Sequence, residues 1–168
     1  MTRSLNLALA FVIAAVSTLP VQAQSARVLG EFRDWASYAA DDGTGTICFA
    51  LSKPKSTEPS AQASADAYVY VTNRPSEDVR TEFNVVAGYT FQTGSIASVA
   101  VGSQRFPLFT QGDAAWLDDS AQAANLAAAI RAGSTLVVTG TAADGTQVTQ
   151  SYSLSGATAA QQAIGAEC

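Results

Sequence analysis

The sequence feature that most constrains the fold is a hairpin pattern over residues 134–156. Two runs rich in Thr, Val and Tyr flank Asp144 and Gly145, a pair that tolerates the positive φ angles of a two-residue turn. A two-residue turn here predicts that Val137 pairs with Tyr152 on the more apolar face of the ribbon. A lone ribbon is only marginally stable in water, so other strands or a helix must cover this face.

The remaining chain repeats this alternation of short strands and turns. Strands are predicted at 28–38 with a break near Asp34, and at 46–52, 66–73, 79–87, 95–101 and 104–109. Helices are predicted at 121–131, after N-cap candidates at 118–120, and from Thr158 to Ile164, where Thr158 and Gln161 match a capping box. The Pro- and Ser-rich segment 53–65 predicts a mobile loop. The fold class is therefore all-β, a mainly antiparallel β-sandwich or open barrel, with two short helices.

The first 23 residues match a secretory signal peptide. Arg3 precedes an apolar run, and Val21-Gln22-Ala23 is a small-x-small cleavage motif, so cleavage is predicted between Ala23 and Gln24. A retained membrane anchor is the alternative, but the apolar run is short for a membrane span. We therefore expect residues 24–168 to form a single exported domain, periplasmic or secreted, without a stable membrane span.

Two cysteines, Cys48 and Cys168, lie in this predicted domain. Exported proteins meet an oxidising environment, in which a pair of cysteines commonly forms a disulfide. The alternative is that Cys168 is a free thiol or pairs with another molecule. A disulfide would attach the end of the chain to an early strand.

Charge and composition exclude several classes of function. The net charge of −5 argues against nucleic acid or anionic membrane as a partner, because both are bound chiefly through Lys and Arg. The chain contains no histidine, which removes Ser-His-Asp and Cys-His catalysis and imidazole metal sites. No catalytic residue, cofactor or metal site is predicted, and the chain is expected not to be an enzyme.

Two kinds of side chain keep other functions open. Carboxylate pairs cleave glycosides, and the candidates are Asp34, Glu82, Asp113, Asp118 and Asp119. Asp118 and Asp119 are explained more simply as a helix cap, and Glu82 as a solvent-facing strand residue. Trp35 and Trp116, with Tyr68 and Tyr70, offer a possible aromatic surface for sugar rings, although tryptophans in small β proteins are more often core residues.

Several short stretches, taken in order, resemble one family of exported proteins. They are Phe32-Arg33-Asp34-Trp35, residues 48–55, Val71-Thr72-Asn73-Arg74-Pro75, residues 85–89, 106–109 and 112–117, 131–134, 140–141 and 151–156. Together they are similar to the invasion-associated locus B family of alphaproteobacteria. The resemblance implies a periplasmic or envelope β-sandwich protein of a Gram-negative bacterium, and it brings no chemical reaction.

The function expected from these observations is contact with another molecule. The leading hypothesis is a non-enzymatic exported protein that binds an unknown protein or envelope component through its surface. A glycan-binding module and a carboxylate-based hydrolase are the alternatives.

Overall fold

The computed structural model describes residues 26–168, so the predicted signal peptide and its cleavage site at Ala23 and Gln24 lie outside the described residues. Within 26–168, 11 strands form one sheet in which every pairing is antiparallel, and two α-helices accompany it. The predicted class, mainly antiparallel β with two helices, is confirmed; the architecture is a single open sheet. No helix in this part of the chain has the length and apolarity needed to cross a membrane.

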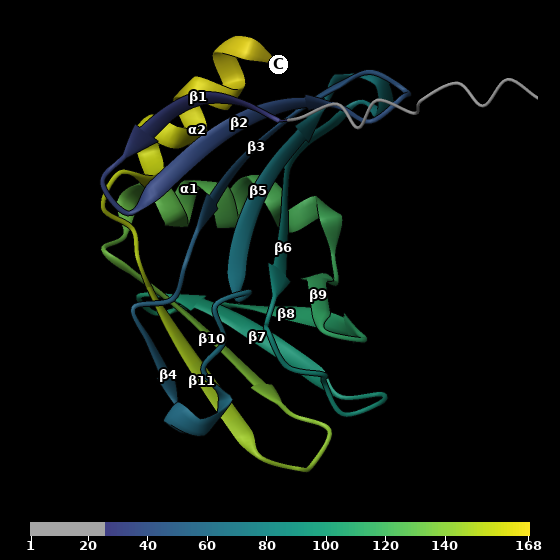
Figure 1. Ribbon diagram of the computed structural model, residues 1–168, viewed down its shortest axis with the longest axis vertical. Coiled ribbons are helices and arrows are strands. Elements are labelled where there is room, and N and C mark those ends of the chain that lie inside the picture. Colours follow the sequence, from purple (N-terminus) through teal and green to yellow (C-terminus); the bar gives the residue numbers. More distant parts are fainter. Residues whose placement is uncertain (1–25) are drawn as a thin grey trace, which may run out of the picture.

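The elements are short and closely spaced along the chain (Figure 1). The strands are β1 (Arg27–Phe32), β2 (Trp35–Asp41), β3 (Thr46–Ser52), β4 (Ser56–Glu58), β5 (Tyr68–Arg74), β6 (Val79–Val86), β7 (Ile96–Val101), β8 (Gln104–Gln111), β9 (Ala114–Leu117), β10 (Thr135–Thr141) and β11 (Gln147–Ser153). The helices are α1 (Ala123–Ala132) and α2 (Ala157–Glu167), with single 3-10 turns η1 (Ser60–Gln62), η2 (Pro75–Glu77) and η3 (Ser120–Gln122).

The sheet is strongly bent, and its strand order is β1-β2-β3-β5-β6-β9-β8-β7-β10-β11-β4. In Figure 1, β1, β2, β3, β5 and β6 form the upper part with both helices behind them, and β7, β8, β10, β11 and β4 form the lower part. β4 follows β3 in the chain but pairs with β11 at the opposite end of the strand order. The chain itself therefore joins the two parts of the sheet.

One apolar core lies between the sheet and the helices. Alternation places Val69 and Val71 of β5 on the buried face, each at most 1% exposed. Leu126 and Ile130 of α1 and Ile164 of α2 close the core from the other side. The helices thus cover the apolar face of the sheet, which the strands themselves leave open.

The β10–β11 hairpin has a different register from the predicted one. Tyr152 pairs with Leu136, and Val137 pairs with Ser151. Gly145 has a φ of +86° and its N–H donates to the carbonyl of Ala142, so the connection has three residues, as in a type I turn followed by a left-handed residue. This extra residue shifts the register by one and turns Leu136 and Tyr152 into the core.

Cys48 and Cys168 are joined by a disulfide, with their Cα atoms 6.0 Å apart. Cys48 lies in β3 and is fully buried, and Cys168 follows α2 directly. The predicted pairing is therefore present in the structure. It fastens the end of α2 to the middle of the upper part of the sheet.

Two local predictions were wrong. The predicted loop 53–65 contains strand β4, in which Thr57 is buried, and turn η1. The second helix begins at Ala157 after Gly156, which has a φ of +96°, and no side chain caps it. Thr158 instead donates a hydrogen bond to the carbonyl of Arg131, which ties α2 to the end of α1.

Candidate functional site

An open groove of about 580 Å³ lies beside the β8–β9 hairpin, at the start of β6 and the start of α1. These elements lie on the right-hand side of the view in Figure 1. We call it the aromatic groove. Its lining comprises Asp78, Val79, Arg80, Glu82, Phe83, Phe109, Gln111, Trp116, Leu117, Ser120 and Ala123.

The lining of the aromatic groove includes a stacked pair of rings. Phe109 of β8 and Trp116 of β9 are direct cross-strand partners, their ring centroids are 5.4 Å apart and their planes differ by 19°. Phe109 is 44% exposed, and Trp116 is half-buried. The next partner in the row is Ile96 of β7, which is 73% exposed. Apolar side chains of this size are normally covered, so their exposure marks a candidate contact surface.

A kink at the start of β6 shapes the polar side of the groove. Asp78 and Thr81 have φ angles of +56° and +53°, and the pairing of β5 with β6 shifts register there. The side chain of Asn73 supports the kink by accepting a hydrogen bond of 2.9 Å from the N–H of Thr81. Asp78, Val79 and Arg80 at the kink line the same groove as the aromatic pair.

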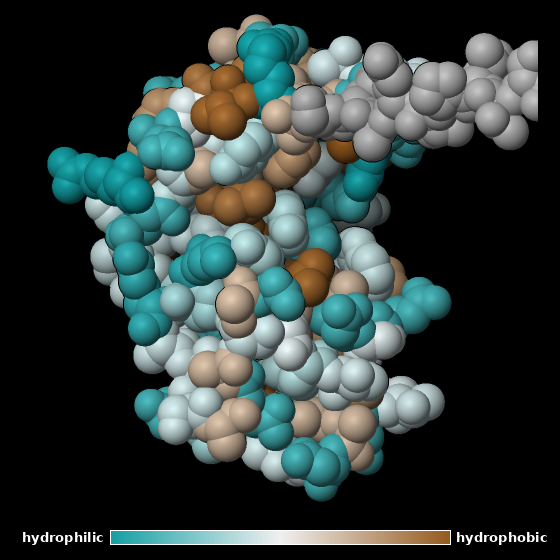
Figure 2. Space-filling view, viewed as in Figure 1, coloured by the Kyte–Doolittle hydropathy of each residue, from teal (hydrophilic) through white to brown (hydrophobic). Residues whose placement is uncertain are grey.

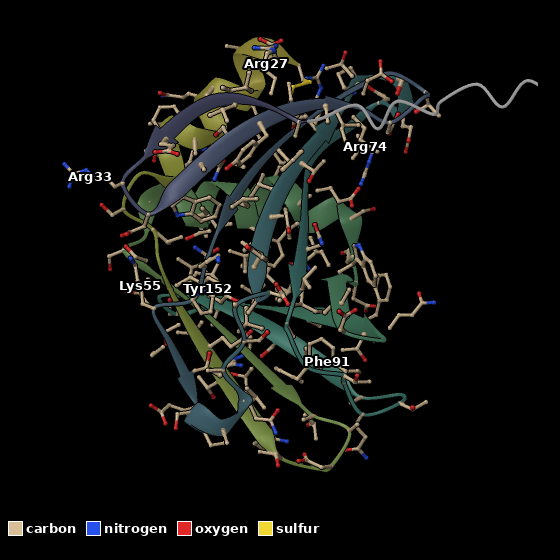
Figure 3. All side chains as sticks on the ribbon, viewed as in Figure 1. Arg27, Arg33, Lys55, Arg74, Phe91 and Tyr152 are labelled. Atoms are coloured by element: carbon tan, nitrogen blue, oxygen red, sulfur yellow. A yellow bond between two sulfur atoms is a disulfide. The ribbon has the colours of Figure 1, made fainter. Side chains whose placement is uncertain are left out.

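Charged residues from β6 and from Asp78 just before it line the aromatic groove. Glu82 forms an ion pair with Arg74, and both side chains are 28% exposed. Arg74 is labelled beside the upper strands in Figure 3. Asp78 and Arg80 complete the charged lining. The groove therefore combines apolar rings with charged groups that form hydrogen bonds.

The two tryptophans that sequence reasoning paired as possible surface contacts lie in different places. Trp35 is only 2% exposed and belongs to the core, so its assignment to a surface was wrong and the core interpretation holds. Its indole N–H donates to the carbonyl of Ser153. Trp116 lines the aromatic groove, and its role in contact stays a prediction.

Tyr68 and Tyr70 belong to a second aromatic row, on the outer face of β2, β3 and β5. Tyr38 stacks on Phe49 with centroids 5.4 Å apart, and Phe49, Tyr70 and Tyr68 continue the row at 6.2 and 5.9 Å. All four rings are partly buried, and burial raises the pKa of Tyr70. On the face shown in Figure 2, the most apolar residues appear as separate spots.

Three of the five candidate carboxylates, Asp34, Glu82 and Asp119, have structural partners. Lys55 hydrogen-bonds to Asp34 and lowers the pKa of that carboxyl. Glu82 pairs with Arg74, and Asp119 accepts a hydrogen bond of 3.0 Å from the N–H of Ala121, as expected for a cap. Among residues 26–168, no group of three or more His, Cys, Asp or Glu side chains is placed to hold a metal ion. The chemistry offered by the groove is stacking, apolar contact and hydrogen bonding.

Sequence reasoning found Trp116 but missed its partner Phe109. The signal was present, because Phe106 and Leu108 alternate with Pro107 and Phe109 along β8. Phe106 and Leu108 are buried, which leaves Phe109 on the outer face. No comparable sequence pattern indicated that β6 contributes to the groove, since this contribution depends on the kink.

Fold and groove together define a small β-sheet protein with one disulfide and an open aromatic groove. A family model described as invasion associated locus B (IalB) protein matches residues 35–165. The chain belongs to the IalB family.

A solved structure has a similar fold. The crystal structure of invasion associated protein B from Bartonella henselae matches with a TM-score of 0.60 and 15% identity, over 82% of this chain and 95% of the other. At this identity the likeness concerns the fold. No curated protein matches the sequence.

Proposed function

We propose that this chain is an exported, non-enzymatic envelope protein that binds a protein partner through the aromatic groove. The signal-peptide pattern of residues 1–23 and the Cys48–Cys168 disulfide support export, because stable disulfides are typical of oxidising compartments. Membership of the IalB family supports a role in the envelope. The domain would then be the mature chain from Gln24 to Cys168.

The observation that carries the proposal is the exposed stack of Phe109 on Trp116 within a groove of about 580 Å³. Protein interfaces concentrate their binding free energy in aromatic and Arg side chains at the centre, and polar groups surround them. Here the two rings are the centre, and Asp78, Arg80 and Glu82 are the polar surround. A partner is expected to insert an apolar side chain between these groups.

The test is chemical crosslinking and capture from a periplasmic extract of the native host. Phe109→Ala and Trp116→Ala are expected to reduce capture of a specific partner at least tenfold, as roughly expected for loss of an interface anchor. Val28→Ala is the matched control, because Val28 is 55% exposed on β1 and does not line the groove. Equal capture by the wild type and both groove variants would show that the groove is not the contact site.

A glycan is the second candidate, favoured by the partly exposed rings that share the groove with Glu82, Asp78 and Gln111, since sugars stack on aromatic faces and bind polar edges. Trp35→Phe leaves Trp116 as the only tryptophan. A glycan ligand is then expected to change the fluorescence of Trp116 with saturation. Oligosaccharides that leave this emission unchanged across an array would remove the glycan candidate and keep the protein candidate.

A further inference from the structure

A second, smaller hollow of about 250 Å³ lies where β5 and the kink of β6 meet the ends of both helices. Its lining comprises Asn73, Arg80, Thr81, Arg131, Gln161, Gln162, Ile164 and Gly165. We call it the cationic pocket. It is smaller than the roughly 300–1,000 Å³ of pockets for drug-sized ligands, so it suits a single small group.

The lining carries two positive charges and no carboxylate. The ion pairs with Asp or Glu side chains found in residues 26–168 use Arg27, Lys55 and Arg74, and neither Arg80 nor Arg131 takes part in one. Arg80 donates to a main-chain oxygen of Cys168, the last residue of the sequence, whose α-carboxylate occupies part of its guanidinium and balances its charge. Arg131 is therefore the cation of the pocket that no carboxylate faces, and an anion bound beside it would balance its charge.

Gln161 adds a donor that lacks an acceptor. Its Oε1 accepts a hydrogen bond of 2.9 Å from Arg131, and a guanidinium only donates, so the orientation of the amide is fixed. Nε2 is then left without a hydrogen-bond partner in the described structure, although Gln161 is only 8% exposed. A buried donor without a partner is costly, and an oxygen atom in the pocket would supply the missing acceptor.

We propose that the cationic pocket binds a tetrahedral oxyanion group, a phosphate or sulfate. Arg80 and Arg131 would supply charge-assisted hydrogen bonds, and Gln161 would supply a neutral one. Such a group has acceptor oxygens in several directions, which matches donors that come from β6, α1 and α2. This site adjoins the proposed partner contact, because Arg80 lines both hollows, whereas Arg131 and Gln161 line only the cationic pocket.

The test is calorimetric titration of the full mature protein with inorganic phosphate at constant ionic strength. Saturable binding with one site is expected, and Arg131→Gln and Arg80→Gln are each expected to weaken it about tenfold or more. Gln162→Glu changes an exposed side chain of the pocket without disturbing the core, and its added negative charge is expected to abolish binding. The side-chain amide signal of Gln161 in an NMR spectrum is expected to shift on addition of phosphate.

Arg105→Gln is the matched control, because it removes one positive charge from β8 outside the pocket. Absence of saturable binding up to about 10 mM phosphate would overturn the proposal, as would an equal loss in Arg105→Gln, which would indicate unspecific charge attraction. Vesicles of phosphatidylglycerol that compete with phosphate would assign the site to a lipid headgroup. Saturable phosphate binding without such competition supports a site for a free or soluble phosphate group.

Discussion

The indole Nε1 of Trp35 donates a hydrogen bond of 2.9 Å to the carbonyl oxygen of Ser153. Trp35 begins β2 and Ser153 ends β11, strands that lie next to the two ends of the strand order. The N–H of Asp34 also donates to the carbonyl of Ser155, 3.2 Å away. The two ends of the bent sheet are not paired as strands, and these contacts from a side chain and from the main chain of the loops link them instead.

Trp35→Phe is expected to lower the free energy of unfolding by about 1–3 kcal/mol, because it leaves the carbonyl of Ser153 without its donor and leaves space in the core. Urea unfolding followed by circular dichroism measures the change. Trp116→Phe serves as the comparison. Trp116 is half-buried, so this variant is expected to lose less of the free energy of unfolding. Equal losses in both variants would contradict a special role for the Trp35 hydrogen bond.

Reduction of the Cys48–Cys168 disulfide is expected to destabilise the fold by about 2–4 kcal/mol, because the bond closes a long loop with a sequence separation of 120. Urea unfolding with and without a thiol reductant checks this. Hydrogen exchange is expected to rise most in α2, whose end the disulfide holds on β3. Unchanged protection of α2 after verified reduction would mean that packing alone holds the helix.

Gly156→Ala is expected to be strongly destabilising, by more than about 2 kcal/mol. An added Cβ would lie 1.7 Å from the carbonyl oxygen of Phe32, and the φ of +96° disfavours any other residue. Gly165→Ala, inside the helix that Gly156 precedes, is the matched control, because its Cβ would have no neighbour within 4 Å. That variant should gain about 0.5–1 kcal/mol from the higher helix propensity of alanine, and thermal unfolding of both variants tests the contrast.

Stability is expected to fall at alkaline pH because of Tyr89. Burial raises the pKa of Tyr89 to about 12, above the usual value of about 10, so the folded state favours the neutral phenol. This contribution is complete below about pH 10 and is lost as the pH rises through 12. Tyr89→Phe should reduce the alkaline loss, as urea unfolding at several pH values would show.

Tyr152→Phe is the contrast to Tyr89→Phe at neutral pH. The hydroxyl of Tyr152 donates to Gln150, whereas that of Tyr89 has no partner in the described residues. Removal of the Tyr152 hydroxyl is expected to lower the free energy of unfolding by about 1 kcal/mol, whereas removal of the unpartnered Tyr89 hydroxyl is expected to leave it unchanged or raise it. Figure 3 places Tyr152 near the junction of the upper and lower parts of the sheet. An equal cost for both variants would contradict this assignment.

Local patterns in the sequence predicted most strands, because residues on the same face of a strand recur at every second position. The break near Asp34 appears as the turn between β1 and β2, and Asp119 caps the helical segment as expected. The register of the β10–β11 hairpin was missed because Asp-Gly suits both two-residue and three-residue connections. β4 was missed because a strand of three residues between prolines has no periodicity to detect.

The candidate site was harder to predict, since it depends on distant segments. Trp35 and Trp116 look alike in sequence, and only their positions in the bent sheet separate a core residue from a groove residue. The cationic pocket joins residues from β5, β6, α1 and α2, and no local motif connects Arg80 with Gln161. The Cys48–Cys168 disulfide could be predicted from the sequence, because the predicted exported domain has only two cysteines and an oxidising compartment favours their pairing.

The brevity of β4 has a consequence for how the molecules behave at high concentration. An uncovered β11 would offer a row of main-chain N–H and C=O groups to a strand of another molecule, the usual start of edge-to-edge aggregation. β4 occupies that position with only three residues, and Pro54 and Pro59, which lack an N–H, lie on either side. The edge strand of the lower part is thus too short to pair with a strand of another molecule, which disfavours aggregation through this edge.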